Sequence, residues 1–111
     1  MYKLIHSKII KKDIGSSHKY IEETLEAPMA ADNLKKELLE KLEYIKEKPY
    51  SRPFVQDTFL ASLGIRAINV KNFVIFYRIK EDEKNVTAVR FMYNKRDWKN
   101  ILKENVLDGI I

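Results

Sequence analysis

The change in hydrophobic period at Gly64 constrains the fold of this chain more than any other feature. On the N-terminal side of Gly64, apolar side chains recur at helical spacing over residues 10–25 and 29–47. On its C-terminal side, β-branched and aromatic residues follow the two-residue alternation of strands. Helices followed by strands predict an α+β fold, in which a helical unit packs against one antiparallel sheet.

Two helices are predicted in the N-terminal half, after a first strand within residues 2–8. The first helix covers about residues 10–25. The second runs over residues 29–47, with Pro28 suited to its first turn and Pro49 ending it. Because neither helix can bury its apolar stripe alone, we expect the two to pack as an antiparallel hairpin.

Three strands are predicted in the C-terminal half, over residues 66–70, 73–79 and 85–93. The connections between them are too short for parallel crossovers, so the strands should form an antiparallel meander. The aromatic residues of segment 49–63 predict a loop folded onto the core, and residues 97–102 a short closing helix with Asp97 as its N-cap. The expected order is β-α-α-β-β-β-α, with one sheet face covered by the helical hairpin and the other partly open.

Length and composition narrow the class of protein. The 111 residues suit a single domain over 1–111. There is no cysteine, which excludes disulfides and thiolate metal sites. No apolar run approaches twenty residues, so we expect neither a membrane span nor a secretory signal, and a cytoplasmic location.

Positive charge is concentrated in the predicted strands. Residues 64–103 hold ten Lys and Arg against four Asp and Glu, in a chain whose formal net charge is +5. The excess predicts a basic sheet surface that contacts nucleic acid or an acidic peptide. The alternative is a set of solvated charges that keep strand edges from aggregating. Eight of these ten residues are the candidates for that surface: Arg66, Arg78, Arg90, Arg96, Lys71, Lys80, Lys95 and Lys99. Tyr77, Tyr93 and Trp98 could stack on bases.

Strand alternation assigns these arginines to faces. Arg66 shares its face with Ile68 and Val70 and is expected at the rim of the helix-covered side. Arg78 shares a face with Val74 and Phe76. On the last strand, alternation places Arg90 with Val86, Ala88 and Met92.

Recognisable catalytic and metal motifs are missing. The two histidines, His6 and His18, are not spaced as ligands on one element, so no metal site is predicted. No GxSxG, P-loop or GxGxxG sequence occurs, and no cofactor is expected.

Two stretches resemble the RelE/ParE toxin superfamily. Residues 64–79 are similar to its paired strands, and residues 90–98 to its closing strand and Arg-Asp element. With the upstream helices and the proline-containing loop, the resemblance spans about residues 2–103. It implies the toxin half of a type II toxin–antitoxin module, of the plasmid-stabilisation type, that a cognate antitoxin neutralises. RelE-like members cleave messenger RNA on the ribosome, whereas ParE-like members inhibit DNA gyrase, so the resemblance leaves either target open.

The resemblance also bears on catalysis. Four positions that carry catalytic residues in RelE fall on Ala67, Asn69, Val74 and Leu102, and only Arg96 retains the family residue. The ParE-like branch is therefore favoured, and enzyme activity is left open. An alternative is a RelE-type endoribonuclease that uses Arg78, Tyr93 and Arg96, and a third reading is an inactive binding module or toxin relic. The residues expected to bind the target or the antitoxin are Arg66, Lys71, Arg90, Lys95 and Trp98.

Overall fold

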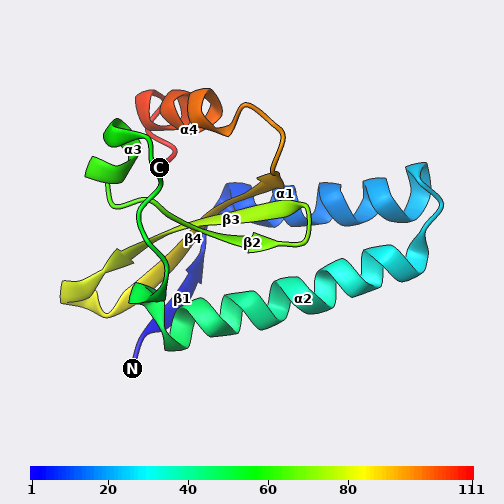
Figure 1. Cartoon of the computed structure of the whole chain (residues 1–111), viewed down its shortest axis with the longest axis horizontal. Helices are drawn as coiled ribbons and strands as arrows, with labels where there is room; N and C mark the ends of the chain where they lie inside the picture. The colour runs from blue at the N-terminus through cyan, green and yellow to red at the C-terminus, as the bar shows by residue number, and fades with distance from the viewer.

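A computed structural model describes all 111 residues and places a four-stranded sheet between two helical layers (Figure 1). The strand order is β1 (Lys3–His6), β4 (Asn85–Tyr93), β3 (Phe73–Lys80) and β2 (Arg66–Val70). Strands β2, β3 and β4 form the predicted antiparallel meander. Strand β1 adds to the edge by pairing in parallel with β4.

The first helical layer is the predicted hairpin. Helix α1 (Lys8–Lys19) continues as a π-helical turn over Tyr20–Thr24, and α2 (Pro28–Glu47) returns antiparallel to it (Figure 1). The Ser7 side chain caps α1 by accepting the Ile10 N–H at 3.0 Å. The apolar stripe of α2 is buried against the sheet, as its spacing predicts; its members are Ala31, Leu34, Leu38, Leu42 and Ile45.

The second sheet face is more covered than predicted. Segment 49–63 holds a short helix, α3 (Thr58–Ser62), which buries Leu60. The closing helix, α4 (Trp98–Leu107), runs one and a half turns beyond the predicted end. Together they cover the core residues Val74, Phe76 and Met92, and the second face stays partly open, for example beside Arg78 and Lys80. Asp97 precedes α4 as predicted, but its carboxylate accepts from the Asn100 side chain rather than capping the backbone.

A β-bulge in β4 changes which residues share a face. Phe76 pairs with Arg90, yet Tyr77 pairs with Ala88, so Val89 is the extra residue. Val86 and Ala88 therefore face the α1–α2 layer, whereas Met92 faces the α3–α4 layer. The prediction that Arg90 shares its face with Val86 and Ala88 is wrong, because the bulge shifts the alternation by one residue.

The segment from β1 into α1 protects the edge of β4. Strand β1 pairs only with Asn85–Ala88. Beyond it, the Ser7 hydroxyl donates to the Val89 carbonyl at 2.6 Å and the Phe91 N–H donates to the Asp13 carboxylate at 3.0 Å. These contacts satisfy backbone groups that a bare edge strand would expose. None of the helices combines the length and the apolar character needed to cross a bilayer.

Candidate functional site

Several of the predicted binding residues meet where the β2–β3 turn lies beside the segment after β4. The Asn94 N–H donates to the Asn72 carbonyl at 2.8 Å, which brings the preceding Lys71 and the following Lys95 to the same place. The Arg96 N–H donates to the Tyr93 carbonyl at 3.1 Å and closes a tight turn. We name this region, made of Lys71, Tyr93, Lys95 and Arg96, the turn-end surface.

The three cations of the turn-end surface are free. Lys71, Lys95 and Arg96 are exposed, and none of the ion pairs in the molecule includes them. Ammonium and guanidinium groups without internal partners are available to carboxylates or phosphates of another molecule. The region therefore has the charge of a surface that recognises an anionic ligand.

An open cleft of about 630 Å³ adjoins these cations. Tyr93 and Arg96 form part of its wall, and the opposite wall comes from the end of the helical hairpin, with Tyr20 and Leu25. Tyr20 and Leu25 are both more than half exposed. The cleft thus places apolar and aromatic surface directly beside positive charge, a combination that suits an amphipathic peptide segment.

Arg78 does not join this site. Its backbone lies opposite Thr87, whereas Tyr93 lies opposite Phe73 at the other end of the same strand pair. Tyr93 lies six positions after Thr87 along β4, which corresponds to roughly 20 Å. Arg78 instead lines a small depression with Lys80, Ser7 and the last two residues, Ile110 and Ile111. The structure therefore does not bring Arg78, Tyr93 and Arg96 together as one catalytic set.

Arg66 lies at the rim of the helix-covered side, as strand alternation predicts. Its guanidinium carbon lies 4.2 Å from the centre of the Phe54 ring and 5.2 Å from that of Tyr50. One of its nitrogens donates to the Arg52 carbonyl. The guanidinium is thus held by internal cation–π and hydrogen-bond contacts, at the end of β2 away from the turn-end surface.

Arg90 is not a surface residue, which corrects the prediction that it binds a partner. Its side chain is 8% exposed, and it donates to both oxygens of Asp13 at 2.8 and 2.9 Å and to Asn105 at 2.7 Å. Every one of these acceptors belongs to the chain itself. Arg90 joins α1, β4 and α4, and almost none of its side chain is exposed to a ligand.

Trp98 contributes mainly to the core. It is half-buried at the start of α4, and its ring lies 5.1 Å from that of Phe76. The Lys99 ammonium lies 5.7 Å from the Trp98 ring centre. The ring packs α4 onto the sheet, and only part of it remains for stacking on another molecule.

A cluster of hydrogen bonds around the carboxylate of Glu81, at the opposite end of the sheet, was not predicted. The hydroxyls of Tyr2 and Tyr50 both donate to Glu81 Oε1 at 2.6 Å, and Lys84 pairs with Oε2. These bonds, led by that of Lys84, lower the pKa of Glu81 to about 2, and the bond to Glu81 raises the pKa of Tyr50 to about 12. Tyr2, Tyr50 and the Glu81–Lys84 pair come from three separate segments of the chain. No spacing in the sequence predicts that they lie together.

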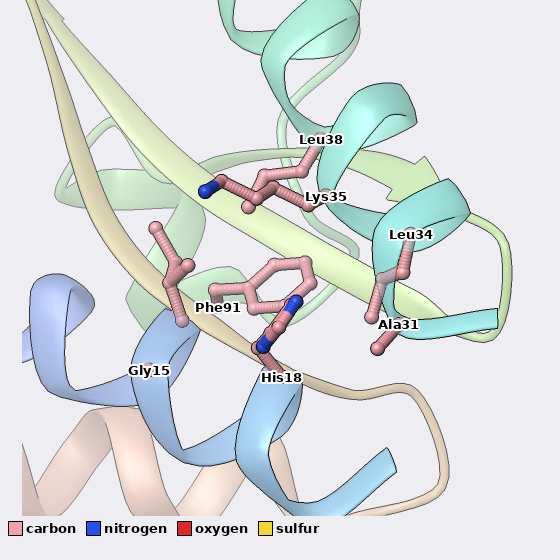
Figure 2. Close-up of a pocket in the computed structure, with 8 residues that line it drawn as sticks. Gly15, His18, Ala31, Leu34, Lys35, Leu38 and Phe91 are labelled. Carbon is pink, nitrogen blue, oxygen red and sulfur yellow. The ribbon is translucent and has the colours of Figure 1, made fainter. Parts of the chain in front are cut away.

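A second unpredicted feature is a small apolar cleft between α1 and α2. Figure 2 shows Gly15 and His18 of α1 and Ala31, Leu34, Lys35 and Leu38 of α2 around Phe91. Its volume is about 220 Å³. The cleft lies between the two helices of the hairpin, and His18 forms part of its wall.

The fold is that of the RelE/ParE class of toxins. The sequence model of the family described as "ParE toxin of type II toxin-antitoxin system, parDE" matches residues 4–98. The chain therefore belongs to the ParE toxin family of type II toxin–antitoxin systems. No curated protein sequence matches the chain significantly.

Two solved structures have a similar fold. One is the chromosomal ParDE toxin–antitoxin system of P. aeruginosa, with a TM-score of 0.63 and 16% identity, covering 84% of this chain and 96% of that one. The other is the RelBE2 toxin–antitoxin complex of Mycobacterium tuberculosis, with a TM-score of 0.59 and 12% identity, covering 83% and 96%. Both likenesses support the predicted superfamily fold.

Proposed function

We propose that the chain, as a single domain over residues 1–111, is a growth-inhibiting toxin of the cytoplasm that acts by binding its target. The expected target is DNA gyrase, and the expected neutralising partner is an antitoxin encoded by the same module. The observation that carries the proposal is the family match over residues 4–98, together with three unpaired cations beside an apolar cleft. We further propose that the module serves plasmid stabilisation, the role that the resemblance to this superfamily implies.

The separation of the candidate catalytic residues supports binding rather than RNA cleavage. Cleavage through a 2′-hydroxyl requires a base, a charge stabiliser and an acid within reach of one phosphate. Arg78 is remote from Tyr93 and Arg96 along the strands. Neither histidine lines the cleft that Tyr93 and Arg96 share. The ribosome-dependent endoribonuclease is therefore the second candidate. Its support is Arg96, the one RelE catalytic position at which this chain retains the family residue.

The turn-end surface suits an antitoxin segment with acidic and apolar residues. Its carboxylates would pair with Lys71, Lys95 and Arg96, and its apolar side chains would enter the cleft next to Tyr93. Such a segment would bury the exposed side chains of Tyr20 and Leu25. A long, mostly disordered partner that folds along this surface would fit its open shape.

Tightly controlled expression in bacteria tests the proposal. Induction should stop growth, and co-expression of the product of a small neighbouring reading frame should restore it. Primer extension on cellular transcripts during the arrest should show intact messages. Cleaved messages would favour the endoribonuclease. Normal growth with soluble, folded protein would favour an inactive relic and contradict the toxin proposal.

A further inference from the structure

Three side chains with metal-binding atoms meet at the far end of the helical hairpin. His18 Nε2 lies 3.5 Å from Asp32 Oδ1 and 4.0 Å from Glu22 Oε2. All three potential ligand atoms lie within 4.8 Å of one another. His18 lies in the last turn of α1, Glu22 belongs to the π-helical turn, and Asp32 lies on α2 across the hairpin.

The two carboxylates have no cationic partner other than His18. The chain carries 21 Lys and Arg residues, yet neither Glu22 nor Asp32 forms an ion pair with any of them. The arrangement places two carboxylates that lack a Lys or Arg partner beside one imidazole nitrogen, and this donor set suits a divalent cation.

The spacing suits a metal ion after small side-chain movements. Ligand atoms about 2.0 Å from a tetrahedral zinc ion lie roughly 3.3 Å apart. The closest pair already has nearly this separation, and the side chains of Glu22 and Asp32 are 44% and 75% exposed, so both are free to turn inward. One imidazole and two carboxylates from two helices would leave a fourth position for water.

We propose that His18, Glu22 and Asp32 form a binding site for a divalent transition-metal ion of the zinc type. The imidazole favours such an ion over Mg²⁺, which prefers oxygen ligands and retains its waters. The bound ion ties the π-helical turn to α2 and closes the end of the hairpin. Because His18 also forms part of the wall of the cleft over Phe91, the ion fixes the shape of that cleft (Figure 2).

Zinc titration of the tag-free chain tests the site, because the chain has only two histidines and no cysteine. At about pH 7.5, Zn²⁺ should shift the NMR signals of the His18 ring and leave those of His6 in place, because a metal ion binds the deprotonated form of its ligand. Calorimetry should give one Zn²⁺ per chain, and Mg²⁺ at the same concentration should give no heat. Thermal unfolding should move to higher temperature with Zn²⁺ only.

Variants separate this site from adventitious binding. His18→Ala should weaken Zn²⁺ affinity by about tenfold or more, and Glu22→Gln and Asp32→Asn should each weaken it. His6→Ala is the matched control and should bind as the unchanged chain does. Circular dichroism verifies that each variant is folded. Equal affinity of His18→Ala and the unchanged chain, an equal loss in His6→Ala, or no Zn²⁺ binding at all would overturn the proposal.

Discussion

The guanidinium of Arg90 lies against the carboxylate of Asp13, with N–O distances of 2.8 and 2.9 Å. The same carboxylate accepts the Phe91 N–H, and Arg90 also donates to Asn105. Three elements far apart in the sequence therefore meet at one nearly buried ion pair. The pair fixes α1 along the edge of β4 and attaches α4 to the opposite face.

Removing the carboxylate from this pair should destabilise the fold severely. Asp13→Ala leaves the Arg90 charge buried without a partner of opposite charge, and such a loss costs about 3–5 kcal/mol of unfolding free energy. Urea unfolding measures the change. Asp82→Ala, at an exposed carboxylate without an ion pair, is the control and should change stability by less than about 0.5 kcal/mol. The double variant Asp13→Ala/Arg90→Met should recover part of the loss. A loss below about 1 kcal/mol in Asp13→Ala would show that the pair is not essential.

Two glycines should respond oppositely to alanine. Gly15 lies inside α1, and a Cβ atom there would meet nothing within 4 Å, so Gly15→Ala should stabilise the chain by about 0.5–1 kcal/mol. Gly64 has a φ of 82°, where a side chain is strained, so Gly64→Ala should cost about 1–2 kcal/mol. Thermal unfolding of both variants is the measurement. If Gly64→Ala stabilised the chain, the result would contradict the left-handed conformation of Gly64 before β2.

The Glu81 cluster should make stability depend on pH in the acid range. Hydrogen bonds from Lys84, Tyr2 and Tyr50 lower the pKa of Glu81 from 4.5 to about 2. A depressed pKa stabilises the fold above pH 4.5, and this stabilisation is lost as the pH falls from there towards 2. The melting temperatures of the unchanged chain and of Glu81→Gln should be compared at each pH. Above pH 4.5 the difference between them should be constant, and below it the unchanged chain should lose melting temperature relative to Glu81→Gln. Parallel curves for the two proteins down to pH 2 would show that the cluster does not stabilise the carboxylate.

Neutralising the turn-end surface should weaken antitoxin binding. Changing Lys71, Lys95 and Arg96 to Gln removes three exposed charges without altering the core. The dissociation constant for the antitoxin should rise by about tenfold or more and lose most of its salt dependence, because exposed ion pairs are screened by salt. The matched control changes Lys11, Lys36 and Lys48, exposed on the helical layer, to Gln. If both triple variants bind alike, the turn-end surface is not the antitoxin site.

The order and type of the main elements were predictable because they depend on local patterns. Pro28 and Pro49 flank α2 where expected, and alternation located the three C-terminal strands. The five-residue helix α3 is too short to show a helical period, so the cover it adds to the second face was missed. The superfamily fold was likewise predictable. The resemblance rested on residues 64–79 and 90–98, and both stretches lie within residues 4–98, which the family model matches.

The placement of the arginines was only partly predictable. The bulge at Val89 depends on how β4 pairs with β3. β4 contains no glycine or proline from which the bulge could be predicted. Alternation therefore misplaced Arg90, while Arg66, on a regular strand, was placed correctly at the rim. Contacts such as Asp13 with Arg90, or Tyr50 with Glu81, join distant segments and emerge only once the chain is folded.

A supercoiling assay with purified protein tests the central claim most directly. The chain should inhibit DNA gyrase in a concentration-dependent way, and addition of the antitoxin should reverse the inhibition. A cell-free translation reaction with the same protein should proceed normally, with its messenger RNA intact. Unimpaired supercoiling together with blocked translation and cleaved message would contradict the account and establish the ribonuclease instead.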